Sequence, residues 1–188
     1  MASDSSTPKT SPELQGSLLL ADPSLRDGTF ARSVVLLAEH APMDGAFGLI
    51  LNQPTGDSVG DILPDDEFIA LRQLAVHDGG PVARDQLTFS ALWWSPKNGL
   101  RWALRISAAE AAVQAQRPGR IVRAFIGYSG WTPGQLENEI QQNSWIHTPP
   151  QPDLFGHIHD QSLWAALLGK ISPLHRILAE APDDPTLN

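Results

Sequence analysis

The chain has 188 residues, 41% hydrophobic and 18% charged, which is typical of one folded domain and too apolar for a disordered chain. Its 13 basic and 21 acidic residues give a net charge of −8, which disfavours nucleic-acid phosphates as partners. The absence of cysteine excludes disulfides, thiolate metal sites and cysteine nucleophiles, and it fits a reducing compartment.

The composition along the chain predicts one domain between two tails. Residues 1–14 are rich in Ser, Thr and Pro and predict a flexible N-terminal tail, residues 15–180 a single domain, and residues 181–188 a frayed C-terminal tail. The N-terminus has no apolar signal core, and no run approaches the roughly 18 apolar residues of a membrane span. We therefore expect a cytoplasmic protein without a membrane partner.

The first part of the chain predicts strands. A short apolar run at 17–21 is followed by two longer runs, at 32–40 and 46–51, that a Gly-containing loop joins into a hairpin. A short helix at 57–63 is predicted before Pro64.

The second part mixes strands with helices. Strands are predicted at 87–94, 100–106 and 121–128, and Ser107 with Glu110 predicts a capped helix at 108–116. Further along, the sequence predicts a helix at 133–142 capped by Thr132, an extended segment at 144–147, a helix at 161–170 capped by Asp160, and a short helix from Ser172 to Leu178. Strands that cluster early, with helices mostly late, favour an α+β fold with helices on the faces of a sheet.

The segment around Ser129 resembles an active-site motif. Ser129 follows an apolar strand and precedes a helix, as the serine of a nucleophile elbow does, but that motif needs glycine where Trp131 stands. We interpret Gly127 and Gly130 as the residues of a tight strand-to-helix turn that Trp131 packs against. Gly79 and Gly80, followed by a proline, predict a second tight, stiff connection.

Polar residues at the ends of apolar strands are the candidate site. A pocket near Arg32, His40, Asn52 and the 129–135 segment, including Gln135, is one hypothesis, because sites collect at strand ends and the loops beyond them. His40 cannot pair directly with its neighbour Glu39, because adjacent strand residues point to opposite faces.

No metal or cofactor is predicted. His157 and His159 resemble a short metal box, but a site needs further ligands, and nothing places His147 or His175 beside them. The common glycine-rich nucleotide loops are absent from the sequence. Whether the protein is an enzyme stays open, with the missing catalytic motif weighing against it.

Six tryptophans are many for this length. Trp93 and Trp94 are adjacent on one predicted strand, so their rings lie on opposite faces. If one face is exposed, its ring forms a candidate partner interface; an edge loop covering it is the alternative. The clustered Arg117, Arg120 and Arg123 are interpreted as a solvated turn rather than a nucleic-acid patch.

Three ordered blocks resemble the AlgH/YqgE family of bacterial proteins over about residues 16–175. They are residues 30–40 with 45–54, residues 79–82, and residues 127–140 with Ser144, Trp145 and 153–155. The resemblance implies a single compact domain with a bifurcated, coiled, mainly antiparallel sheet flanked by helices. It carries over no catalytic residue, and the family's label of transcriptional regulator comes from genetic association. The recurring positions are Arg32, His40, Asn52, Gly79, Gly80, Gln135 and Glu137.

Three functions follow as hypotheses. The first is a regulatory or adaptor protein acting through a protein or small-molecule partner, and the second is an enzyme or ligand-binding domain with a polar pocket near His40, Asn52 and Gln135. Direct DNA binding is the weakest, because the chain is acidic and shows no helix-turn-helix pattern. The sequence leaves the oligomeric state open.

Overall fold

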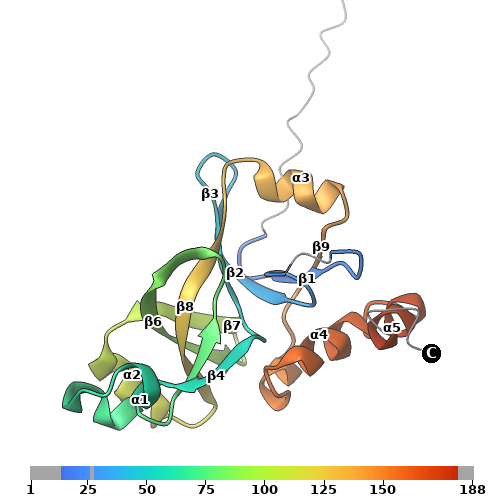
Figure 1. Ribbon diagram of the computed structural model, residues 1–188. Coiled ribbons are helices and arrows are strands. Elements are labelled where there is room, and N and C mark those ends of the chain that lie inside the picture. The colour runs from blue at the N-terminus through green and yellow to red at the C-terminus, as the bar shows by residue number, and fades with distance from the viewer. Residues whose placement is uncertain (1–13, 26–27, 182–188) are drawn as a thin grey trace, which may run out of the picture.

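A computed structural model describes residues 14–25 and 28–181. Within these ranges, nine strands form one curled sheet with helices on its faces (Figure 1). The strands are β1 (Leu18–Ala21), β2 (Val34–Ala41), β3 (Gly45–Ile50), β4 (Pro54–Ser58), β5 (Ala75–Asp78), β6 (Val82–Ser95), β7 (Gly99–Ile106), β8 (Arg120–Trp131) and β9 (Trp145–Thr148). The helices are α1 (Val59–Ile62), α2 (Ala108–Ala115), α3 (Gln135–Gln141), α4 (Gln161–Leu168) and α5 (Pro173–Glu180), with 3₁₀ helices η1 (Asp66–Leu71) and η2 (Pro152–Gly156). No helix in the described ranges is long and apolar enough to cross a membrane.

The sheet forks at β8. The first half of β8 pairs with β5 in parallel and with β6 antiparallel, whereas Ser129–Trp131 pairs antiparallel with β3. From β3 the sheet continues through β2 and β1 to β9, and β7 extends the other branch beyond β6. The bifurcated, mainly antiparallel α+β sheet is therefore confirmed, with β5–β8 as a parallel pair.

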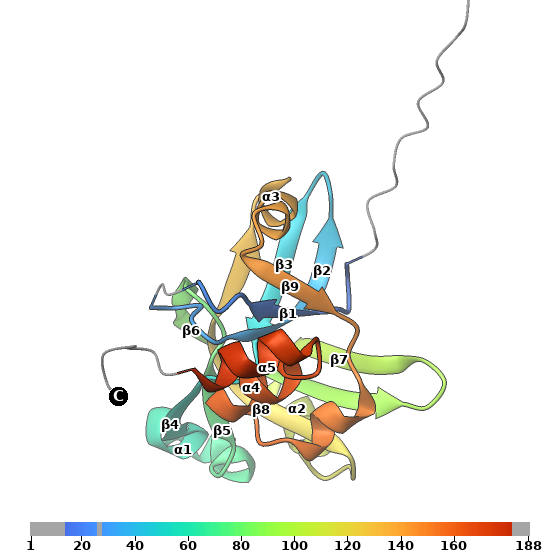
Figure 2. The same ribbon diagram turned by 90° about the vertical axis from the view of Figure 1, so that its right-hand side faces the viewer.

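The central strands are buried on both faces. Leu18, Leu20 and Leu36 of β1 and β2 pack under α4, whereas Leu19 and Leu37 face the opposite side, toward α3. Figure 2 shows α4 and α5 in front of this part of the sheet and α3 beside the β2–β3 hairpin. Burial of both faces explains why these strands read as continuous apolar runs rather than as alternating patterns.

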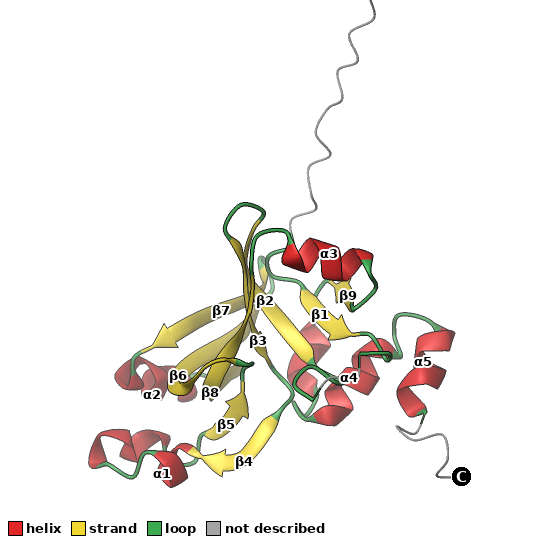
Figure 3. Ribbon diagram, turned by 45° about the horizontal axis from the view of Figure 1, so that its top comes forward, coloured by secondary structure: helices red, strands yellow, loops and turns green. Residues whose placement is uncertain are grey.

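A third group of buried residues fills the other branch. Val76 of β5, Phe89 of β6 and Ala124 of β8 pack with α1, η1 and α2, which lie together at one end of the molecule (Figure 3). Helices thus cover both branches of the fork.

Several predicted elements are confirmed. The 32–40 and 46–51 runs form the β2–β3 hairpin, and β1, β7 and β9 lie where the sequence places them. Ser107, Asp160 and Ser172 cap α2, α4 and α5 through their side-chain oxygens. The two predicted tails fall mostly outside the described ranges; at their inner ends, Leu14 is buried in the core beneath α3, and the carbonyl of Ala181 accepts a bond from Arg32.

Two predictions around Ser129 are wrong. No turn begins there, because β8 continues through Ser129 to Trp131. The following helix begins at Gln135 with Gly134 as N-cap, at φ 76°, and not at Pro133 with Thr132 as cap. The Gln135 side-chain oxygen accepts from the backbone N–H and hydroxyl of Thr132, so this hydroxyl acts as a donor and does not cap the helix.

Candidate functional site

A large open cleft lies at one end of the central strands. It encloses about 930 Å³, within the range of small-molecule sites. We call it the Arg32 cleft; it is lined by residues 22–25, Gly28, Ala31, Arg32, residues 53–55, Asp78, Asp160, Gln161, Trp164, Leu178 and Ala181. Its walls come from the segments after β1, β3 and β5 and from α4 and α5, so five distant parts of the chain meet there.

Among the described residues, three carboxylates line the Arg32 cleft. Asp22 Oδ1 accepts from the N–H and hydroxyl of Ser24, and Asp160 Oδ1 accepts in the same way from Ser162. The hydroxyl and N–H of Ser162 hold the pKa of Asp160 below its usual value, so this carboxylate is anionic at neutral pH. The third, Asp78, forms a 2.6 Å ion pair with Arg84.

Arg32 is the cation among the described residues of the lining. Its guanidinium carbon lies 5.6 Å from the ring centroid of Trp164, and Nη2 donates to the carbonyl of Ala181. Its backbone has a φ of 54°, a region that costs energy for a residue with a Cβ. The fully buried Asn52 holds this conformation, since its amide donates to the Arg32 carbonyl at 2.9 Å and its oxygen accepts from Val34 N–H at 2.7 Å. Asn52 therefore supports the cleft and does not line it.

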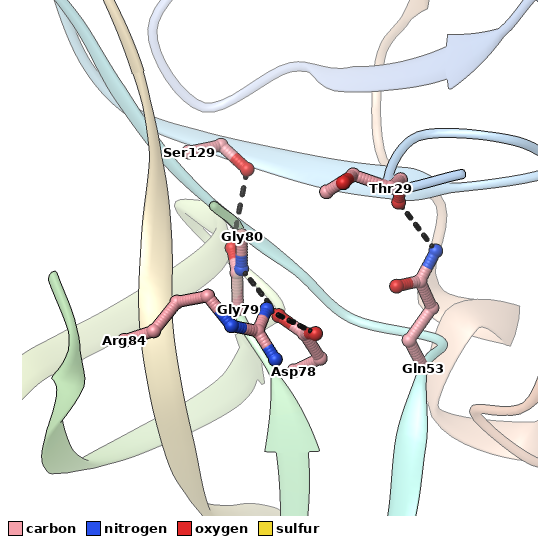
Figure 4. Close-up of polar contacts among 7 residues, drawn as sticks. All are labelled: Thr29, Gln53, Asp78, Gly79, Gly80, Arg84 and Ser129. Atoms are coloured by element: carbon pink, nitrogen blue, oxygen red, sulfur yellow. Dashed lines mark hydrogen bonds and ion pairs between the residues drawn. The ribbon is translucent and has the colours of Figure 1, made fainter. Parts of the chain in front are cut away.

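The Asp78–Gly80 corner follows β5, and of these residues only Asp78 lines the cleft. Figure 4 shows Asp78 between Arg84 and the N–H of Gly80, and Ser129 reaching the carbonyl of Gly79. A Cβ on Gly80, whose φ is 141°, would lie 2.3 Å from the Tyr128 carbonyl carbon, so only glycine fits against β8 there. Ser129 is fully buried and its hydroxyl donates to the Gly79 carbonyl at 3.1 Å, which gives it a structural role and no access to a substrate.

The other predicted site residues lie on and around α3. His40 Nε2 lies 2.7 Å from Glu137 Oε1, with the imidazole 4% and the carboxylate 26% exposed. Gln135 donates to Glu139 Oε1, while Glu139 Oε2 accepts from the indole N–H groups of Trp131 and Trp145. These bonds join α3 to β2, β8 and β9.

His40, Asn52 and Gln135 therefore do not line one pocket, and the single-pocket hypothesis for these residues is wrong. Asn52 accepts a hydrogen bond from Val34 at the start of β2. His40 lies six positions further along this strand, which places it roughly 20 Å from Val34. The extended geometry of β2 places Arg32 and Asn52 at one end, and His40, Glu137 and Gln135 at the other.

The two histidines after η2, His157 and His159, contact neighbouring residues of the fold. His157 lies 3.9 Å from Asp153, whereas His159 is buried and its Nε2 bonds to the Leu154 carbonyl. The buried His77 directs its Nε2 to the carbonyl of His159 at 3.3 Å. Burial, and then the nearby Arg123, lowers the pKa of His77 and of His159 to about 4. Among residues 14–25 and 28–181, no three His, Cys, Asp or Glu side chains are grouped as metal ligands.

Trp93 and Trp94 lie on opposite faces of β6 and are both half-buried. Trp93 packs with the residues around α2, and Trp94 with those around α4. The Arg120 guanidinium stacks 3.9 Å from the Trp93 ring centroid, while Arg123 is largely buried and donates to the Leu51 carbonyl. Arg120 and Arg123 therefore do not share a basic patch in the described structure.

Sequence reasoning found Arg32 but missed most of the cleft. Of its described carboxylates the sequence predicts a role only for Asp160, as a helix cap, and the structure confirms that cap. Asp22 and Asp78 each stand at the carboxyl end of a buried strand, which is the available signal. That α4 returns to cover these ends depends on the tertiary fold.

Comparisons with known proteins agree with this fold. The model of the AlgH-like family matches residues 18–175. A UPF0301 protein of Streptomyces coelicolor, SCO2948, is 36% identical, covering 93% of this chain and 95% of its own; one of Bacteroides fragilis, BF2109, is 34% identical, covering 93% and 91%.

Two solved structures are similar. Protein DIP2367 of Corynebacterium diphtheriae has a TM-score of 0.68 at 22% identity and covers 93% of this chain and 95% of its own, so it supports the fold alone. The AlgH protein of Pseudomonas aeruginosa has a TM-score of 0.64 at 26% identity, covering 95% of this chain and 100% of its own. With the family model matching most of the chain, this protein belongs to the AlgH-like family.

Proposed function

We propose that this protein is a cytoplasmic regulatory protein whose partner is a small molecule bound in the Arg32 cleft. The observation that carries the proposal is the cleft itself, whose volume of about 930 Å³ suits a small organic molecule. Its lining combines apolar surface from Leu25, Trp164 and Leu178 with charged groups at its edges, as ligand sites do.

The rigid support of the cleft also favours binding. Asn52 fixes the backbone at Arg32, and Gln53 Nε2 donates to the Thr29 carbonyl at 2.9 Å across the cleft margin (Figure 4). The Asp78–Gly80 corner is held against β8 by Ser129. Walls fixed before a ligand arrives lower the entropic cost of binding it.

A thermal-shift screen against a metabolite library tests the proposal. A ligand at about 100 times its Kd stabilises the folded state by about 2.7 kcal/mol, which raises the Tm by several degrees. Ala31→Trp fills the cleft and should abolish the shift, whereas Lys97→Trp, in the exposed β6–β7 turn, should retain it. Hits that stabilise the Ala31→Trp variant equally would place binding elsewhere and reject the proposal.

A second candidate is an adaptor that uses a protein partner. The observation that favours it is the Trp93–Arg120 stack, since Trp and Arg are among the residue types that contribute most to the binding free energy at protein interfaces. Pull-downs with the intact chain and with a Trp93→Ala, Trp94→Ala variant test it. A partner recovered equally by both would exclude this surface, provided circular dichroism shows that the variant is folded.

A further inference from the structure

Two carboxylates, Asp22 and Asp160, give the Arg32 cleft unused acceptor capacity. Asp22 and Asp160 each use Oδ1 to hold a serine. Their Oδ2 atoms receive no hydrogen bond from a described residue. These two carboxylates stand on the segment after β1 and at the start of α4, and both line the same cleft.

Several donors of the lining are already engaged, whereas the side-chain amide of Gln161 has no hydrogen bond to a described residue. Gln53 spends its amide N–H on the Thr29 carbonyl, which leaves its oxygen without a donor among the described residues. The Thr55 hydroxyl donates to the carbonyl of Val76, and Arg32 donates to that of Ala181 while stacked over Trp164. A ligand that brings donors therefore matches the acceptor atoms that Asp22, Asp160 and Gln53 leave free.

The balance of charge points the same way. Among the described residues, the cleft is lined by Asp22, Asp78 and Asp160 against Arg32, and Arg84 pairs with Asp78 from outside the lining. The whole chain carries −8, so the field around the cleft favours cations and disfavours phosphates and carboxylates. The apolar walls of Leu25 and Leu178 add room for a short hydrocarbon chain.

We propose that the Arg32 cleft binds an organic cation, an ammonium or guanidinium group on a short aliphatic chain, with Asp22 and Asp160 as its counter-ions. The proposal rests on the function proposed above and names the ligand class of that cleft. A planar guanidinium offers several N–H donors and forms strong charge-assisted bonds with carboxylates.

The test uses three small probes of similar shape on the full chain. Butylguanidinium is the cation, butylurea its neutral counterpart and pentanoate the anion, with inorganic phosphate as a second anion. Each is titrated while amide shifts are followed by ¹H–¹⁵N NMR. Butylguanidinium should shift the amides lining the cleft saturably, and butylurea should bind about tenfold more weakly.

Two matched substitutions locate the counter-ions. Asp22→Asn and Asp160→Asn remove a charge yet keep the oxygen that holds Ser24 or Ser162, so the turn and the cap of α4 survive. Each should weaken butylguanidinium binding about fivefold. Asp44→Asn, which makes the same change in the β2–β3 turn away from the cleft, should leave the affinity unchanged.

The outcomes separate this proposal from the one it rests on. Cleft shifts with pentanoate or phosphate but none with butylguanidinium would overturn the ligand class and leave a ligand-binding cleft. Unchanged cation affinity in both Asn variants would overturn the assignment of the counter-ions. No cleft shift with any of the four probes would overturn both proposals.

Discussion

At the scale of single residues, two buried histidines make stability depend on pH. His77 and His159 are each 3% exposed, and each directs Nε2 to a backbone carbonyl. Because a carbonyl only accepts, the proton of the neutral ring is on Nε2. Neither Nδ1 has a hydrogen-bond partner among the described residues. A second proton on either ring would therefore be buried beside Arg123 without a counter-ion.

The sign of the effect follows from the pKa values. Burial and Arg123 lower the pKa of His77 and of His159 from 6.5 to about 4, so between these values the unfolded chain binds more protons than the folded one. The free energy of unfolding should be unaffected by these rings above pH 6.5 and fall as the pH drops toward 4, by about 2–3 kcal/mol for each ring.

Urea denaturation followed by tryptophan fluorescence at pH 7, 5.5 and 4.5 measures this fall. His77→Gln removes one titrating ring and should flatten the profile, whereas His147→Gln, on β9, is the control and should leave the profile as it is. Parallel profiles for the intact chain and His77→Gln would contradict the prediction.

At the scale of elements, α3 depends on side-chain contacts with the sheet, because it is too short to be stable by itself. Glu139 accepts from the indole N–H groups of Trp131 on β8 and Trp145 on β9, both at 2.8 Å. The two indoles meet edge to face, and Phe30 stacks on Trp131 and meets Trp145 edge to face. His40–Glu137 ties the same helix to β2. A helix of seven residues is too short to be stable alone in water, so these contacts and the buried Leu136 determine its position.

Glu139→Leu should therefore destabilise the protein by about 3 kcal/mol, because two buried indole N–H groups lose their acceptor. Glu139→Gln keeps an oxygen acceptor and should lower the free energy of unfolding by only about 1 kcal/mol. Urea denaturation gives the free energies, and ¹H–¹⁵N NMR should show the Trp131 and Trp145 indole resonances moving upfield in Glu139→Leu alone. Equal losses in both variants would show that charge, and not the acceptor, matters at this position.

The ends of the helices and strands differ in how far the sequence predicts them. Ser107, Asp160 and Ser172 act locally, through bonds to N–H groups two or three residues ahead, so the starts of α2, α4 and α5 were predictable. The start of α3 was not, because the Thr132 hydroxyl donates to Gln135 and does not accept from the helix, and Gly134 takes a positive φ. The extension of β8 through Ser129 depends on β3 pairing beside it, which is a contact between distant segments.

At the scale of the whole molecule, the fold was easier to predict than the site. Continuous apolar runs indicated a sheet buried on both faces, and that is what α3 and α4 produce around β1 and β2. The Arg32 cleft needed information that no local pattern holds. Asp22, Asp78 and Asp160 are far apart in sequence, and only the curl of the sheet and the return of α4 bring them to one place.

Whole-molecule charge also predicts that the chain does not bind duplex DNA directly. Its net charge is −8, and two arginines of the most compact basic group are engaged inside the structure, Arg120 over Trp93 and Arg123 at the Leu51 carbonyl. Burial lowers the pKa of Arg123 to about 10, and at neutral pH it is charged but largely withdrawn from solvent. Non-specific binding to DNA depends on neutralising several phosphates with accessible cations, and this group offers few.

Fluorescence anisotropy of a labelled duplex at low ionic strength measures the interaction where it would be strongest. The expected result is no saturable binding at protein concentrations up to about 10⁻⁴ M, the weak limit of ordinary non-specific affinity. A saturable signal that declines linearly with the logarithm of salt concentration would contradict the prediction. In that case Arg117→Gln, in the turn before β8, would decide whether the basic group carries the binding, because its loss would reduce the salt slope by about one.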